Sequence, residues 1–159
     1  MNKLICRLFL MVAFVGILSS CREDAEIPNH GKAINPEKEV AGTYVGTWTK
    51  TMKDNPADCV EAPGSIVLAA TDEAYVGTVE VVCDDTSMNF SSFAGTTSRC
   101  NVIYQTGQYS FHNPLATNGL GTIFTGTVSF SGEATMTFSQ SIKVGRVTYT
   151  YVYTFNGTK

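Results

Sequence analysis

The segment RVTYTYVYTFN, residues 146–156, decides the fold because its side chains alternate between two kinds. The odd-numbered side chains are apolar or aromatic: Val147, Tyr149, Tyr151, Tyr153 and Phe155. The even-numbered ones are Arg146, Thr148, Thr150, Val152, Thr154 and Asn156, of which only Val152 is apolar. A helix would scatter the aromatic rings around its axis, whereas a strand collects them on one face. The segment is therefore predicted to be a β-strand with one buried face.

The same period of two recurs along the chain from residue 41 onward. It predicts strands at residues 42–52, 64–71, 75–83, 100–106, 108–113, 121–131, 133–141 and 146–157, and 88–93 could add a short ninth. Short turns such as Thr106-Gly107 and Val144-Gly145 separate several of them, which is typical of hairpins. A meander of eight strands hides its edges by closing on itself. We therefore predict an all-β fold, an up-and-down antiparallel β-barrel over residues 41–159. The alternative is a β-sandwich. It needs longer connections between strands, which residues 53–63 and 84–99 could supply.

The N-terminal residues have the pattern of a secretion signal followed by a lipidation site. Lys3 and Arg7 precede an apolar run at residues 8–18, which is too short to span a bilayer but fits a secretion signal. Leu18-Ser19-Ser20-Cys21 resembles the bacterial lipobox, in which the cysteine is acylated. Residues 1–20 are thus predicted to be a signal peptide, and Cys21 a lipidated N-terminus that holds the protein at the outer membrane. The acidic cluster at 22–26 is either a mark for the cell surface or a spacer, and residues 21–40 form a flexible tether.

A family resemblance supports the barrel. Gly46-Thr47-Trp48 in the first strand is similar to the Gly-x-Trp opening of lipocalins and other calycins, and residues 153–159 resemble the closing strand of lipocalin-like lipoproteins. The resemblance implies that Trp48 plugs one end of the barrel and that a basic residue, here Arg146, crosses it. It also implies that a small apolar or amphipathic ligand binds inside. The Thr-Asp-Tyr motif of the family is absent.

Charge and motifs exclude several classes of function. The predicted domain has nine acidic and six basic side chains, so it lacks the basic cluster that nucleic acid binding needs. His112 is the only histidine in the domain, and the acidic pairs Asp72-Glu73 and Asp84-Asp85 are interpreted as turn residues. We therefore expect neither catalysis nor a cofactor. The spacing of the three domain cysteines matches no common zinc site, so we expect no metal.

Those three cysteines, Cys59, Cys83 and Cys100, allow one disulfide in an oxidising compartment. Cys59 and Cys83 flank the hairpin of the second and third strands, so we favour a Cys59–Cys83 bond. The alternative is Cys83–Cys100, across residues 84–99.

The packing of the aromatic residues inside the barrel determines which of two functions is available. An eight-stranded barrel is either filled by side chains or holds one small ligand. In the second case Tyr44, Tyr149, Tyr151 and Tyr153 would provide apolar walls with hydroxyl tips. We expect this ligand-binding role, with a surface interaction module as the alternative. In that alternative, loops 53–63 and 84–99 contact an envelope protein, a glycan or a host factor.

Overall fold

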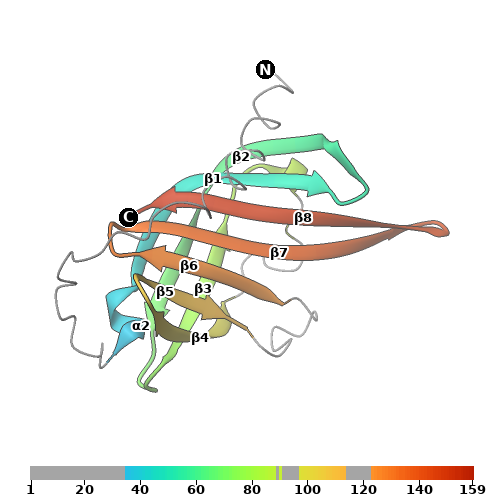
Figure 1. The fold of residues 1–159 in the computed structure, drawn as a ribbon. Helices are drawn as coiled ribbons and strands as arrows, with labels where there is room; N and C mark the ends of the chain where they lie inside the picture. Colours follow the sequence, from blue (N-terminus) through green and yellow to red (C-terminus); the bar gives the residue numbers. More distant parts are fainter. Residues whose placement is uncertain (1–34, 89, 91–96, 114–122) are drawn as a thin grey trace.

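A computed structural model shows that the chain folds into a closed β-barrel. The structure describes residues 35–88, 90, 97–113 and 123–159. The predicted signal peptide, Cys21 and the tether up to residue 34 lie outside these residues. The eight strands are β1 (Gly42–Met52), β2 (Asn55–Ala70), β3 (Val76–Val82), β4 (Ser98–Gln105), β5 (Gln108–His112), β6 (Phe124–Ser129), β7 (Glu133–Val144) and β8 (Val147–Thr158). Each pairs antiparallel with the next, and β8 pairs with β1 (Figure 1). The predicted up-and-down barrel is confirmed.

The possible ninth strand at 88–93 is not formed by the two residues of that range that the structure describes. Thr86–Met88 is a short 3₁₀ helix, η1, and Phe90 lies in irregular structure. Residues 89 and 91–93 lie outside the described part of the chain.

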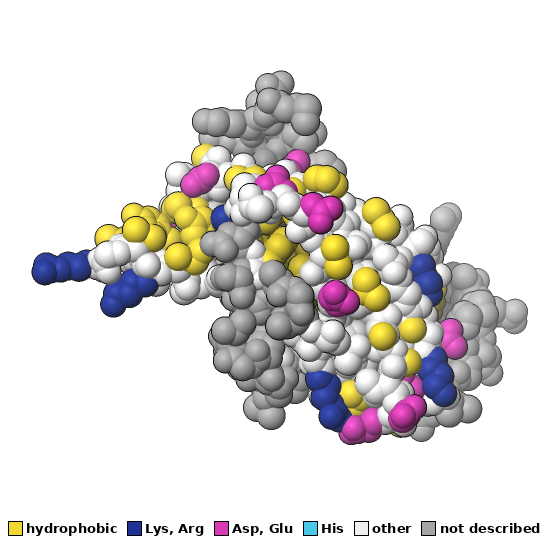
Figure 2. All heavy atoms as spheres, turned by 180° about the vertical axis from the view of Figure 1, so that it is seen from behind, with side chains coloured by type: hydrophobic (Ala, Val, Ile, Leu, Met, Phe, Trp, Pro, Cys, Tyr) yellow, Lys and Arg dark blue, Asp and Glu magenta, His cyan; other side chains and the backbone are white. Residues whose placement is uncertain are grey.

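Four neighbouring strands are much longer than the other four. The strands β1, β2, β7 and β8 have 11, 16, 12 and 12 residues, whereas β3 to β6 have five to eight. The strand β3 ends opposite Ser65 of β2, and β6 begins opposite Phe138 of β7. The long strands therefore project beyond the barrel as a sheet (Figure 1), which we call the flange, residues 50–60 and 140–152. Hydrophobic side chains gather along this projecting arm (Figure 2).

The flange corrects one expectation from the sequence. Residues 53–63 are not a loop, because only Lys53 and Asp54 form the turn and Asn55 already begins β2. This part of β2 contains Pro56 and Pro63. They are tolerated because this part of β2 lies beyond the end of β3, at the edge of the sheet, where a missing N–H breaks no ladder on that side.

The domain begins before the predicted boundary at residue 41. A short helix, α2 (Pro36–Glu39), packs against β2 and β4 at the end of the barrel opposite the flange. Its Glu37 is buried and accepts a hydrogen bond of 3.0 Å from the backbone N–H of Tyr75, a residue with a left-handed φ of 66°. Val40 is also buried, and its carbonyl accepts a 2.7 Å hydrogen bond from the Tyr44 hydroxyl. Residues 35–40 are therefore part of the fold, not of the tether.

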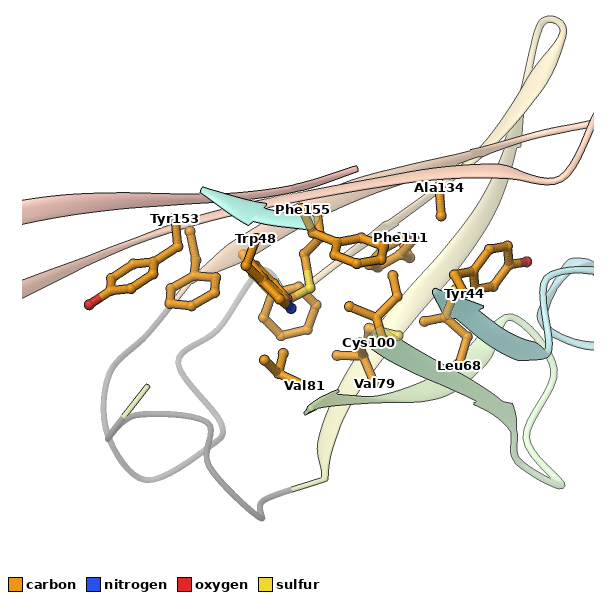
Figure 3. Close-up of a cluster of buried hydrophobic side chains, with 14 of the residues drawn as sticks. Tyr44, Trp48, Leu68, Val79, Val81, Cys100, Phe111, Ala134, Tyr153 and Phe155 are labelled. Atoms are coloured by element: carbon orange, nitrogen blue, oxygen red, sulfur yellow. The ribbon is translucent and has the colours of Figure 1, made fainter. Parts of the chain in front are cut away.

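Aromatic side chains fill the barrel (Figure 3). The largest fully buried side chains are Trp48, Tyr44, Tyr153, Phe111, Phe124, Phe155, Ile66, Met88, Met136, Glu37 and Val40. The Trp48 ring lies 4.9 Å from the ring of Phe90, 5.1 Å from Phe155 and 5.8 Å from Phe138, measured between centroids. Of the two interiors considered from the sequence, the structure shows the packed one.

Candidate functional site

The four tyrosines expected to line a ligand cup do not surround one cavity. Tyr44 and Tyr153 are fully buried in the core, at 1% and 0% exposure. Burial raises the pKa of Tyr153 to about 12, with a smaller contribution from Tyr151, and it also raises the pKa of Tyr44. Tyr149 and Tyr151 lie further along the same face of β8, on the flange, and both are half-buried. Only these two can contact a ligand without displacing the core.

The expected pair of Trp48 and Arg146 is also separated. Trp48 pairs with Phe155 across β1 and β8 and packs inside the barrel. Arg146 lies nine residues before Phe155, in the turn between β7 and β8, which is about 30 Å along the strand. Arg146 therefore does not cross the barrel end, and the role that the resemblance implied for it is wrong. The Trp48 ring instead contacts Phe90, from the segment after β3.

The inner face of the flange continues the inner face of the barrel. It carries Lys50, Met52, Val60, Gln140, Ile142, Tyr149 and Tyr151, all half-buried. Met52 pairs with Tyr151, and Ile142 pairs with Tyr149, so the apolar side chains form a continuous strip. The short strands do not reach this strip, because β3 ends opposite Ser65 and β6 begins opposite Phe138, both nearer the barrel. The flange thus presents aromatic and aliphatic surface that the core covers only in part, with Val60 and Tyr151 packed against the edge of the core.

A lysine ties the base of the flange to the segment that closes the barrel. Lys50 Nζ lies 4.7 Å from the centroid of the Tyr151 ring, and it donates a 2.9 Å hydrogen bond to the carbonyl of Ser87 in η1. A cation over a tyrosine face is attracted by the ring's quadrupole. The strip is therefore held in place at this end and carries one positive charge.

The segment 84–99 is not a free loop where the structure describes it. Met88 and Phe90 are buried, at 0% and 6% exposure, and Phe90 packs against Trp48 and Tyr153. Asp85 accepts a 2.8 Å hydrogen bond from the backbone of Ser87, and hydrogen bonds from the Ser87 side chain and backbone lower the pKa of Asp85. Residues 98 and 99 already belong to β4. The described part of this segment closes the barrel end.

A second aromatic group lies at the opposite end, near α2. The rings of Tyr104 and Phe130 stack 6.0 Å apart, and Tyr109 packs edge-on against both. Burial raises the pKa of Tyr109, with smaller contributions from the charges of Glu39 and Tyr104. These residues continue the inward positions of β4, β5 and β6, so they cap the core at that end.

A hollow of about 440 Å³ lies where β6 begins beside β7. It is lined by Ile123, Phe124, Thr125, Thr137, Phe138 and Ser139. Phe124 and Phe138 are buried, so their side chains point into the core, whereas Ile123, Thr125 and Ser139 are exposed. The hollow is therefore on the outer wall of the barrel, not in its interior.

The favoured disulfide, Cys59–Cys83, is wrong, because Cys83 is a free thiol in the structure, as is Cys100. The strand register gives the reason. Cys83 follows Val82, which pairs with Ser65, so it lies beside Gly64, and Cys59 is five residues further along β2, about 17 Å away. The alternative fails in the same way: Cys100 pairs with Gly77, six residues or about 20 Å from Cys83. A disulfide bridges Cα atoms less than about 7 Å apart.

The two free thiols are expected to differ in reactivity. Burial raises the pKa of Cys100 to about 12, and its side chain is 1% exposed, whereas Cys83 is half-exposed and donates a weak hydrogen bond to the Pro63 carbonyl. The thiolate is the reactive form. Iodoacetamide at pH 8 should modify Cys83 in the folded protein and Cys100 only after denaturation, which peptide mass mapping reads out. Equal modification of both thiols in the folded protein would contradict the packing of β4.

The acidic pairs have structural partners. Glu73 forms an ion pair with the exposed Arg99, and Asp85 caps the backbone of Ser87. The described residues contain no group of three or more histidine, cysteine or acidic side chains that could hold a metal. Within the same residues, no helix has the length and apolar character that a membrane span requires.

The sequence missed the flange residues Met52, Val60 and Ile142 as candidates. Their inward positions follow from the alternation of β1, β2 and β7, so a signal was present in the sequence. The loop that the sequence predicts at residues 53–63 obscures this signal for Val60.

Comparison with known proteins adds no relative. No protein-family model matches this chain, and no curated protein sequence matches it.

Proposed function

We propose that this protein is a lipid-anchored cell-envelope protein that binds a small amphipathic molecule without catalysis. Its binding site is the inner face of the flange, at Tyr149 and Tyr151, not the centre of the barrel. The observation that carries the proposal is the contrast between a barrel filled with side chains and a flange strip whose aromatic side chains remain half-exposed. Exposed apolar strips of this kind mark binding sites.

The chemistry of the strip fits an amphipathic ligand. Met52, Val60 and Ile142 offer aliphatic contacts, and the two tyrosines add flat rings with a hydroxyl tip. Lys50, at the base of the strip, supplies a positive charge beside the Tyr151 ring. A ligand with an apolar body and a polar or acidic head would match this order of side chains.

The alternative function, an interaction module acting through loops 53–63 and 84–99, has less support. Most of residues 53–63 belong to β2, and Met88 and Phe90 pack into the barrel end. We therefore place the binding of any partner on the flange as well.

Removal of the flange tyrosines tests the site. The double variant Tyr149→Ala/Tyr151→Ala should weaken binding of the fluorescent amphiphile N-phenyl-1-naphthylamine about tenfold or more, because two aromatic contacts are lost. The matched control is Tyr104→Ala, a tyrosine that is 40% exposed at the opposite end of the barrel. Equal binding by the double variant and the control would reject the flange as the site.

Native mass spectrometry then identifies the natural ligand. The exported protein is incubated with a lipid extract of a Gram-negative bacterium and measured under native and denaturing conditions. An adduct that is lost on denaturation, and that the double variant fails to form, supports the proposal. A bare mass under both conditions contradicts it and favours a macromolecular partner.

Acylation is tested separately, because it rests on residues 1–21 alone. The change Cys21→Ser should abolish incorporation of radiolabelled palmitate and release the protein from the membrane fraction. Cys6→Ser is the matched control, since Cys6 lies in the predicted signal peptide, and it should leave both properties unchanged. Palmitate incorporation by the Cys21→Ser variant would refute the lipobox reading.

A further inference from the structure

The end of the β7–β8 hairpin projects beyond every other described strand. The last pairing between β1 and β8 joins Met52 and Tyr151, and the backbone N–H of Lys53 donates a 2.9 Å hydrogen bond to the Thr150 carbonyl. Beyond this point the pairs Ile142–Tyr149, Lys143–Thr148 and Val144–Val147 form a two-stranded ribbon. Gly145, with a φ of 62°, and Arg146 make its turn. This tip, residues 142–149, extends about 10 Å past Thr150.

The tip is amphipathic. Because side chains alternate along each strand, Ile142, Val144, Val147 and Tyr149 share one face, and Lys143 and Thr148 share the other. Val144 is 62% exposed and Val147 is 51% exposed, although each is aliphatic. They pair directly across the ribbon, so together they form an apolar point at the extremity of the molecule.

The charge of the tip is opposite in sign to that of the rest of the domain. The chain has no acidic residue after Glu133, and its cations after that position are Lys143, Arg146 and Lys159. Lys159 lies at the other end of β8, where it donates a hydrogen bond to the Ala41 carbonyl. Lys143 and Arg146 are thus the charged residues of the tip, and Figure 2 shows that the projecting arm ends in Lys and Arg side chains.

We propose that the tip docks on an anionic lipid bilayer. Val144 and Val147 enter the boundary between headgroups and acyl chains, and Lys143 and Arg146 contact lipid phosphates. Interfacial segments combine apolar side chains that insert with basic side chains that anionic lipids attract. The core of a protein–protein interface is instead depleted of charged side chains. The proposal depends neither on the acylation of Cys21 nor on a ligand at Tyr149 and Tyr151.

Tryptophan fluorescence tests this contact in the full chain. Trp48 is the only native tryptophan and is fully buried, so a tryptophan introduced at the surface dominates the response to lipid. Val144→Trp is compared with Val45→Trp, which replaces an exposed valine on the barrel wall, 66% exposed. In vesicles of phosphatidylglycerol and brominated phosphatidylcholine, Val144→Trp should lose about half its added emission by quenching, and Val45→Trp should lose none. Any other attachment of the chain is the same in both variants.

Charge variants and controls complete the test. Lys143→Gln/Arg146→Gln, added to Val144→Trp, should reduce the quenching, as should high salt or vesicles of phosphatidylcholine alone. Lys38→Gln, on α2, should change nothing. Equal quenching at positions 144 and 45 in anionic vesicles would overturn the proposal and leave the ligand site untouched. A blue shift of Val144→Trp that needs no lipid and grows with protein concentration would also overturn it, in favour of a second copy of this chain.

Discussion

Replacement of Trp48 by alanine is expected to lower the free energy of unfolding by about 3–5 kcal/mol, as measured by urea denaturation. Trp48 has the largest fully buried side chain, and its ring contacts Phe90, Phe138 and Phe155 at once. The change removes the buried ring and leaves a cavity that neighbouring strands of a closed barrel cannot collapse into. A domain of this size is stable by about 5–15 kcal/mol, so the change should remove a large fraction of the total stability.

The control for this change is Tyr104→Ala. Tyr104 is also aromatic and packs against Tyr109 and Phe130, but it is 40% exposed. Its replacement by alanine should lower the free energy of unfolding by about 1 kcal/mol, since part of the Tyr104 surface is already in water. If Trp48→Ala destabilises the protein no more than Tyr104→Ala, then Trp48 does not hold the core together.

Gly46→Ala is expected to have the second large effect, a loss of about 3 kcal/mol or more. Gly46 pairs with Gly157 where β1 meets β8. A Cβ at Gly46 would overlap the Asn156 carbonyl oxygen and the Gly157 Cα, which are backbone atoms. Backbone cannot turn away as a side chain can, so relief requires β1 and β8 to separate, and these two strands close the barrel.

Two further variants isolate the cause. Gly157→Ala should be similarly harmful, because its Cβ would contact the Phe155 ring and lie 2.7 Å from the Val45 carbonyl oxygen. Thr47→Ala, the next position of β1, has an exposed side chain and should cost less than about 1 kcal/mol. Thermal unfolding of the four proteins measures the difference. A Gly46→Ala variant as stable as Thr47→Ala would show that the strands do not approach this closely.

Gly46 and Trp48 also explain the Gly-x-Trp segment in physical terms. Both residues point inward from β1, where glycine lets β8 approach and tryptophan fills the space that follows. The role that the lipocalin resemblance implied for Arg146 is wrong, because β8 extends beyond the barrel and Arg146 lies in the turn at its far end.

Much of the fold was predictable from the sequence because its signal is local. Alternating side chains in β1 and β8, and glycine turns such as Val144-Gly145, placed the strands with errors of a few residues. The largest error is the first part of β2, which continues past the end of β3 where a connection was predicted. The lipobox ending at Cys21 is likewise a local pattern, and it remains a prediction.

The candidate site was less predictable because it depends on how far each strand extends past its neighbours. Tyr149 and Tyr153 occupy equivalent positions in the repeating pattern of β8, yet Tyr153 is sealed in the core and Tyr149 lies on the flange. The difference arises because β3 and β6 do not extend along the sheet as far as Tyr151. The predicted Cys59–Cys83 disulfide is wrong for the same reason, since Cys59 lies on the part of β2 that extends beyond the end of β3.

The sequence by itself determined that this protein is a meander of strands with one apolar face, because the period of two is written in each segment independently. Tertiary structure alone decided that the barrel is filled, which tyrosines stay accessible, and that Lys143 and Arg146 stand at a projecting tip. Those outcomes follow from strand register and from the unequal lengths of paired strands. Both are relations between distant segments, and no single segment contains them.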